Sequence, residues 1–85
     1  MNCIGWAVKQ MRDGQRVRRT GWNGKGMWLA LMSSQWSGAP MWACAMPVEW
    51  NGYLPFVVMY TADKFLVPWL CSQTDLLATD WEIAS

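Results

Sequence analysis

The sequence predicts a small α+β domain in which an N-terminal helix packs on an antiparallel sheet of four or five strands. Three observations predict this fold class. The chain has 85 residues, which suffice for one hydrophobic core but not for two. Its first residues repeat apolar side chains with a helical period, and the remainder divides into short apolar runs separated by turn residues. We therefore take residues 1–85 as a single domain.

The helix is predicted at the N-terminus. Four apolar side chains recur at the i, i+3, i+4 and i+7 spacing that places them on one helical face: Ile4, Ala7, Val8 and Met11. Asn2 is the candidate N-cap, and Gly14 is the candidate C-terminal stop because glycine readily adopts the conformation that ends a helix. The pattern predicts a helix over residues 3–13.

A hairpin is predicted directly after the helix. Residues 15–20 form its first strand, with arginines on both faces. Asn23 and Gly24 predict a type I′ turn, because both residue types tolerate a positive φ. The returning strand, residues 27–32, is apolar on both faces, so both faces are expected to be buried.

The second half of the chain supplies the remaining strands. Residues 33–54 are too long for a structureless connection in a compact domain, and a further strand is expected inside them at residues 41–46. Residues 56–60 and 65–67 form two more strands, joined by a turn at residues 61–64. The sheet therefore has four or five strands.

Proline and polar residues close the domain. Pro68 lacks a backbone donor, so it should end the strand pairing or lie at the edge of the sheet. Residues 72–83 are expected to close the fold behind it.

The composition disfavours metal binding, catalysis and membrane insertion. The chain has no histidine, and its three cysteines are far apart in the sequence, so neither a zinc site, a cofactor nor a Ser-His or Cys-His nucleophile is expected. No run of about 18 apolar residues is present, and the N-terminus does not have the pattern of a signal peptide. We expect a cytoplasmic protein that is not an enzyme.

The charges and tryptophans point to a partner. The net charge is only +1, but six of the seven Lys and Arg residues lie between Lys9 and Lys25, and five of the six acidic residues lie from Glu49 onward. The basic segment could bind phosphate or could pair with the acidic half of the chain, and both interpretations stay open. Eight tryptophans in a 53% hydrophobic chain exceed what one small core can bury. A homo-oligomer or a flat ligand would cover the excess.

The stretch VPWLCSQTDLLATDW at residues 67–81 has two interpretations. Ser72 followed by Asp75 fits a capping box at the start of a short helix, which the local pattern favours. The same start offers unpaired backbone N–H groups, and Ser, Gln and Thr side chains add donors, so the stretch could also form the polar floor of a pocket. Asp75 and Asp80 could also form the acid/base pair of a glycoside hydrolase, although two carboxylates around a cap are usually structural.

The loop GWNGKG at residues 21–26 lacks the spacing of the known glycine-rich phosphate loops, and the hairpin explains its glycines better. Trp22 and Lys25 remain available for a ligand at its tip. Aromatic faces stack on bases and arginines match phosphates, so this region makes a nucleotide site plausible.

Together, these motifs resemble the Thoeris anti-defence 2 family, small phage proteins that act as sponges for immune signalling nucleotides. The likeness covers most of the chain and rests on Gly14 with Arg18 and Arg19, GWNGKGMWL at 21–29, LPFVVMYTAD at 54–63, and the stretch at 67–81. It implies a homo-oligomer, with a tetramer as the expected form, whose intersubunit pockets bind a cyclic nucleotide signal without cleaving it. Glycocyclic ADP-ribose, made by the TIR enzyme of the defence system, is the implied ligand, with cyclic dinucleotides of the CBASS type as further ligands.

The expected site combines the basic loop with the polar floor. In it, Arg19 contacts phosphate, Trp22 or Trp69 supplies a flat wall, and Asp75 accepts a ribose hydroxyl or base N–H. The full set of predicted ligand-binding residues is Arg19, Trp22, Asn23, Lys25, Trp69, Ser72, Gln73, Thr74 and Asp75. The alternatives are a single-stranded nucleic-acid module, for which a net charge of +1 is weak, and a purely structural phage protein.

Overall fold

The computed structural model describes residues 1–32 and 54–84, and within them it has the predicted α+β architecture. The elements follow in the order α1 (Ile4–Arg12), β1 (Val17–Arg19), β2 (Trp28–Met32), β3 (Phe56–Tyr60), β4 (Leu66–Pro68), α2 (Gln73–Leu76) and β5 (Trp81–Ile83). The five strands of the described residues form one antiparallel sheet in the order β4-β3-β2-β1-β5. The strand expected at residues 41–46 lies outside the described residues.

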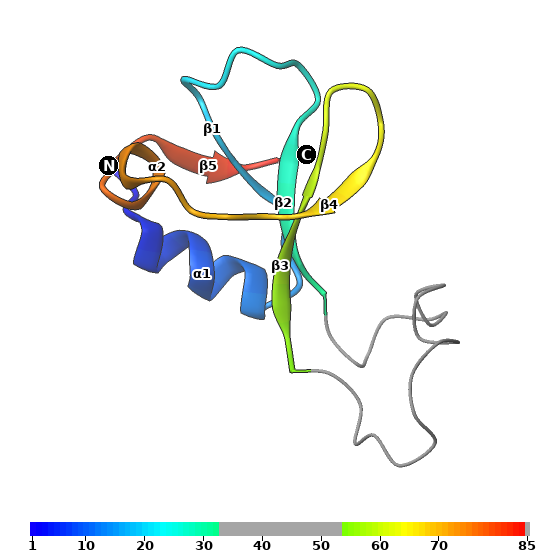
Figure 1. Cartoon of the computed structure of the whole chain (residues 1–85). Coiled ribbons are helices and arrows are strands. Elements are labelled where there is room, and N and C mark those ends of the chain that lie inside the picture. The colour runs from blue at the N-terminus through cyan, green and yellow to red at the C-terminus, as the bar shows by residue number, and fades with distance from the viewer. Residues whose placement is uncertain (33–53, 85) are drawn as a thin grey trace.

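Helix α1 packs on one end of this sheet. It contacts β1, β2 and β5, while β3 and β4 extend away from it (Figure 1). The prediction of a helix over residues 3–13 is confirmed to within one residue at each end. Gly14 stops the helix as predicted, with a φ of 89°.

The predicted N-cap of α1 was wrong by one residue. Cys3 occupies the cap position, and its side chain makes no capping hydrogen bond. Asn2 instead bridges to Asp80, and its Nδ2 donates to the Trp81 carbonyl oxygen at 3.1 Å. The N-terminus therefore fastens the last strand to the domain rather than capping the helix.

Strands β1 and β2 pair antiparallel through Val17 and Leu29, as the hairpin prediction requires, but the predicted type I′ turn was wrong. Neither Asn23 nor Gly24 has a positive φ, and the one positive φ in the loop between the strands belongs to Gly26, at 78°. Asp80, which is distant in the sequence, accepts hydrogen bonds from Thr20 and Gly21 at the start of this loop, so the chain does not form a two-residue turn there.

The second hairpin agrees with the sequence prediction. Strands β3 and β4 pair through the predicted turn, in which the Thr61 N–H donates to the Phe65 carbonyl at 2.8 Å. Pro68 lies in β4, at the edge of the sheet, as expected. The Trp69 N–H donates to Val57, and because hydrogen-bonded pairs alternate along an antiparallel ladder, the nitrogen of Pro68 faces away from β3.

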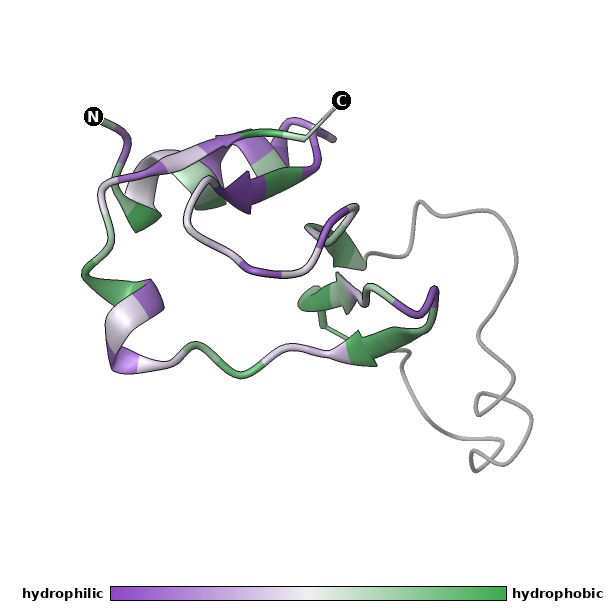
Figure 2. Cartoon of the chain, turned by 90° about the horizontal axis from the view of Figure 1, so that it is seen from above, coloured by the Kyte–Doolittle hydropathy of each residue, from purple (hydrophilic) through white to green (hydrophobic). Residues whose placement is uncertain are grey.

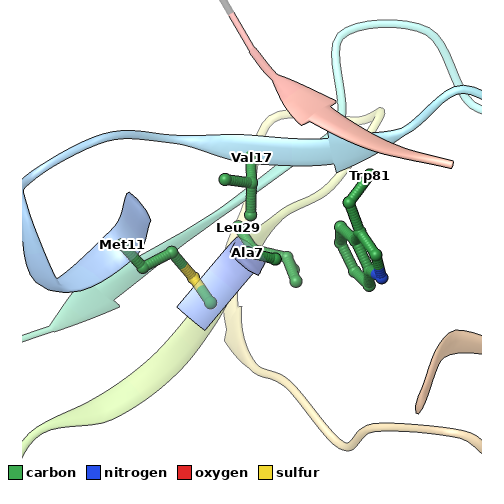
Figure 3. Close-up of a cluster of buried hydrophobic side chains, with 5 residues drawn as sticks. All are labelled: Ala7, Met11, Val17, Leu29 and Trp81. Atoms are coloured by element: carbon green, nitrogen blue, oxygen red, sulfur yellow. The ribbon is translucent and has the colours of Figure 1, made fainter. Parts of the chain in front are cut away.

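Strand β5 was not predicted as a strand. It lies beside β1, so that Arg18 is opposite Glu82 and Arg19 is opposite Trp81. This pairing brings Trp81 into the core, where it is 2% exposed. The side chains of the core cluster point toward one another from α1, β1, β2 and β5 (Figure 3): Ala7, Met11, Val17, Leu29 and Trp81.

The centre of β2 is buried on both faces, as predicted. Leu29 is fully buried in the core, and Ala30, which points to the opposite face, is 6% exposed. Trp28, at the start of the strand, is only half-buried. Neither helix of the described residues approaches the length or the hydropathy that a membrane crossing requires.

Candidate functional site

An ionic cluster joins three segments that are distant in the sequence. Arg19 in β1 donates from Nη1 to Asp75 Oδ1 at 2.7 Å and from Nε to Asp80 Oδ1 at 2.8 Å. Asp75 belongs to α2, and Asp80 directly precedes β5. The three side chains are 14–30% exposed, so water screens these contacts only in part. Of the two interpretations of the basic segment, pairing with the acidic half is therefore realised at this arginine.

Asp80 also holds the loop after β1. Its Oδ2 accepts hydrogen bonds from the Gly21 N–H at 3.0 Å and from the Thr20 hydroxyl at 3.2 Å. A side chain at position 21 would meet this carboxylate, because a Cβ there would lie 3.0 Å from Oδ2. Glycine at this position thus lets the backbone approach Asp80 closely.

The charges of the cluster keep both carboxylates ionised. Burial acts to raise the pKa of Asp75, but hydrogen bonds from Arg19, Trp22 and the Ser72 cap outweigh it, so the pKa lies below its ordinary value. The pKa of Asp80 is also lowered, chiefly by the hydrogen bond from Arg19. A general acid needs a raised pKa, so this pair is poorly suited to glycoside hydrolysis.

The N-cap predicted at α2 is confirmed, although the Asp75 carboxylate bonds to Arg19 and Trp22, and no return bond from the Ser72 N–H completes a capping box among the described contacts. Ser72 is the N-cap, and its hydroxyl accepts a hydrogen bond from the Asp75 N–H at 3.2 Å. The Ser72 and Thr74 hydroxyls lie 3.0 Å apart, and both residues are exposed, as is Gln73. The first turn of α2 therefore presents polar groups to its surroundings while Asp75 turns inward to Arg19.

Three tryptophans form the wall behind the cluster. Trp22 and Trp69 both pack edge-on to Trp81, with ring centroids 5.5 and 6.1 Å away. The indole N–H of Trp22 donates to Asp75 Oδ1 at 3.3 Å, and that of Trp81 donates to the Asp75 carbonyl oxygen, also at 3.3 Å. These bonds fix the orientations of the Trp22 and Trp81 rings, because each of the two has a partner for its polar atom.

A cavity of about 270 Å³ lies beside this cluster, between the β1–β2 loop and β5. Its lining contains three cations, one carboxylate and one indole, and consists of Arg18, Arg19, Thr20, Trp22, Gly24, Lys25, Gly26, Met27 and Glu82. Arg18 is opposite Glu82 in the sheet, and its Nε donates to Glu82 Oε1 at 2.9 Å. We refer to this space as the loop cavity.

The loop cavity brings together some of the predicted ligand residues but not others. Arg19, Trp22 and Lys25 line it. Asn23 is exposed at the loop tip and is not part of the lining. Asp75 stands behind the lining, bonded to two of its members. The other four predicted residues lie outside the cavity: Trp69, the N-cap Ser72, and Gln73 and Thr74 of α2.

The sequence prediction missed two charged residues of the loop cavity. Arg18 was noted in the basic segment and in the family motif but was left out of the predicted ligand-binding set, and Glu82 was not assigned to the site. The signal for both was the alternation of Trp81, Glu82 and Ile83, which is typical of a strand. Pairing such a strand with residues 17–19 places its carboxylate opposite an arginine.

A second cavity, of about 230 Å³, lies where α1 ends and β2 begins. It is lined in part by Arg16 and Trp28. The Arg16 guanidinium lies 4.9 Å from the centre of the Trp28 ring, which stacks on Tyr60 at 4.9 Å. Trp28 is thus already engaged by two neighbours, and this cavity contains none of the predicted ligand residues.

The fold and the loop cavity define a small α+β domain whose candidate site is built from arginines, lysine and tryptophan. Comparison with known proteins identifies its family. A family model described as the Thoeris anti-defense 2-like domain matches residues 2–84. The protein named Thoeris anti-defense 2 of Bacillus phage SP01 is 35% identical over 83 residues, which cover 96% of this chain and 93% of that protein. The chain belongs to the Thoeris anti-defense 2-like family, and its role is in phage anti-defence.

Proposed function

We propose that the protein is a sponge that binds a cyclic nucleotide immune signal and sequesters it uncleaved in the host cytoplasm, so that the signal cannot activate the host effector. Glycocyclic ADP-ribose is the proposed ligand, with cyclic dinucleotides as further candidates. The observation that carries this proposal is the loop cavity, in which an indole stands beside three cations. Indoles stack on bases, and guanidinium and ammonium groups bind phosphate, so this lining suits a nucleotide.

Lys25 is the cation best placed to receive phosphate. Arg18 is paired with Glu82, and Arg19 with two carboxylates. Lys25 has no ion-pair partner among residues 1–32 and 54–84. An unpaired ammonium can bind an anion without breaking an existing contact.

Binding without cleavage is consistent with the state of the nearby carboxylates. Asp75 and Asp80 both have lowered pKa values and both bond to Arg19. An ionised carboxylate held in an ion pair neither donates a proton nor attacks readily as a nucleophile. We therefore propose that the site binds without chemistry.

We further propose that a second copy of the chain completes the site, within a homo-oligomer whose expected form is a tetramer. The loop cavity is slightly smaller than the roughly 300–1,000 Å³ of typical ligand pockets, so one chain does not enclose a cyclic nucleotide. Large apolar side chains are also exposed around β4 and α2, among them Phe65 at 66%, Leu70 at 92% and Leu77 at 75%. Such a surface is typical of a protein interface.

The experiment that tests this proposal measures both binding and turnover. Incubation with glycocyclic ADP-ribose should deplete the free ligand, and heating the complex should release the same molecule intact by chromatography. Lys25→Ala should weaken binding by roughly tenfold, the loss of one charge-assisted contact. Lys9→Ala, which removes an exposed lysine of α1 outside the loop cavity, is the matched control and should bind normally.

Two results would contradict the proposal. A cleaved product in the chromatogram would show an enzyme rather than a sponge. Tight binding of single-stranded oligonucleotides with a steep salt dependence, without binding of the cyclic nucleotide, would favour the nucleic-acid module instead.

A further inference from the structure

The loop cavity has one carboxylate in its lining, and the proposed function leaves it without a role. Glu82 lies in β5 opposite Arg18, and the two side chains form one side of the cavity. They are 38% and 39% exposed, so a ligand can reach both. A carboxylate is an unexpected lining for a site that binds phosphate, because two negative charges repel each other.

The charges divide the loop cavity into two unlike ends. On the sheet side, each arginine of the lining is already neutralised by carboxylates, Arg18 by Glu82 alone and Arg19 by two. On the loop side, Lys25 has no such partner among the described residues. An anionic group therefore gains most beside Lys25 and least beside Glu82.

Glu82 retains acceptor capacity while it is paired. Arg18 contacts one of its oxygens, Oε1, through a single N–H. An ionised carboxylate has about four acceptor positions on its two oxygens. The remaining positions suit a hydroxyl or N–H donor of a ligand.

We propose that Glu82 is the specificity-determining residue of the loop cavity. It accepts a ribose hydroxyl or base N–H of the ligand and excludes phosphate from the sheet end, so that the phosphates lie toward Lys25. This assignment rests on the proposed function of the cavity as a nucleotide site. It explains how a site with three cations can prefer a nucleotide to a bare polyphosphate.

The alternative role for Glu82 is purely structural. A cross-strand ion pair of this exposure contributes little to stability, and its loss would affect all ligands alike. The specificity-determining role and the structural role of Glu82 therefore predict different values of one measurable quantity. This quantity is the ratio of affinities for two anions that differ in their hydrogen-bond donors.

The test uses glycocyclic ADP-ribose and inorganic pyrophosphate, measured by calorimetric titration of the full chain at one ionic strength. Both probes carry a diphosphate, but only the first has ribose hydroxyls and base N–H groups. Glu82→Gln should lower the affinity for the nucleotide by roughly tenfold, the loss of one charge-assisted hydrogen bond, and should raise that for pyrophosphate. The affinity ratio should shift toward pyrophosphate by more than about tenfold.

Two variants separate this effect from its alternatives. Arg18→Gln removes the same ion pair but leaves the carboxylate, so it should lower the pyrophosphate affinity, opposite to Glu82→Gln. Asp13→Asn makes the same change in net charge at an exposed residue outside the loop cavity and should leave the ratio unchanged.

An unchanged ratio in Glu82→Gln would overturn the assignment, as would an equal shift in Asp13→Asn. If the wild-type protein binds the nucleotide and only the ratio fails to change, the proposed function stands without this role for Glu82. If the wild-type protein binds neither probe, the proposed function fails together with the assignment.

Discussion

The two ends of the sheet differ in whether their side chains find partners within the chain. At the ionic corner, which consists of Arg18, Arg19, Asp75, Asp80 and Glu82, each charge has a partner within the chain. At the apolar edge, which consists of Phe65, Leu66, Val67 and Leu70 around β4, large side chains are 39–92% exposed. Figure 2 shows the contrast, with purple on β1 and green on β3 and β4. The ionic corner is complete in one chain, whereas the apolar edge is suited to a partner.

The apolar edge is also restricted in the kind of partner it can accept. Residues 65–74 contain no charged side chain, so the surface is compatible with a copy of itself, as a two-fold interface requires. The nitrogen of Pro68 faces outward but carries no hydrogen, which interrupts the donors that an added strand would need. A second copy is therefore expected to pack through side chains rather than to extend the sheet.

The largest expected effect concerns the residue that joins the ionic corner to the core. Trp81→Ala should reduce the free energy of unfolding by about 3–5 kcal/mol, because the ring is 2% exposed and its removal leaves a cavity. Urea denaturation measures this loss. Trp81→Phe keeps one six-membered ring but removes the pyrrole part of the indole with the N–H that donates to the Asp75 carbonyl, so its loss should be smaller than that of Trp81→Ala. A loss below about 1 kcal/mol for Trp81→Ala would show that the corner is not anchored through this residue.

The second prediction tests whether the apolar edge is an interface. Leu70→Glu should raise the dissociation constant of the oligomer by more than tenfold, since it places a charge on a surface that would lose its water. Light scattering over a range of micromolar concentrations measures the change in mass. Val8→Glu, at an exposed residue of α1, is the control and should leave the mass unchanged. A wild-type protein that is a folded monomer throughout this range would contradict the comparison.

Acid should weaken the ionic corner before the apolar edge. The pKa values of Asp75 and Asp80 are lower in the folded chain than their ordinary values, so the unfolded chain binds more protons at acid pH. Their contribution to stability is full well above the ordinary aspartate pKa of about 3.9 and is lost as the pH falls through the lowered values. Urea midpoints measured between neutral pH and pH values of about 3 should fall, and Asp80→Asn should flatten the decline. An equally steep decline in this variant would assign the acid sensitivity to other groups.

The same contrast explains which parts of the molecule the sequence could predict. Helix α1, strand β3 and the Ser72 cap depend on neighbouring residues, and local patterns predicted all three. The turn after β1 and strand β5 were missed because a contact between residues about 60 positions apart, that of Asp80 with Gly21, determines the path of the loop. No local propensity carries that information.

The residues of the candidate site also differ in whether local sequence could predict them. Arg19, Trp22 and Lys25 lie within seven residues of one another, the sequence analysis placed all three in one predicted site, and all three line the loop cavity. Glu82 enters the loop cavity only through the pairing of β5 with β1, so its place could not be inferred without the sheet order. The contact of Asp75 with a ligand, proposed from the sequence, remains a prediction. The structure shows the groups that hold this carboxylate, Arg19 and Trp22.

The smallest predicted effect is a difference in the pH dependence of alkylation between two thiols, Cys3 near the ionic corner and Cys71 beside the apolar edge. Backbone hydrogen bonds, first from the N–H of Trp6 and then from that of Gly5, lower the pKa of Cys3. Burial and the charge of Asp75 raise the pKa of Cys71, which follows Leu70 of the apolar edge. Because the thiolate is the reactive form, alkylation by iodoacetamide should reach half its maximal rate at a lower pH for Cys3 than for Cys71. The rates are measured by mass spectrometry with Cys44 replaced by serine.

The concentration dependence of these rates sharpens the comparison further. Both thiols are exposed in the single chain. If the apolar edge is an interface, alkylation of Cys71 should slow as the protein concentration rises through the association range, whereas that of Cys3 should not. Leu70→Glu should restore the faster rate at Cys71 at every concentration. Equal protection of both thiols, or protection that persists in Leu70→Glu, would place the contact between copies elsewhere on the chain.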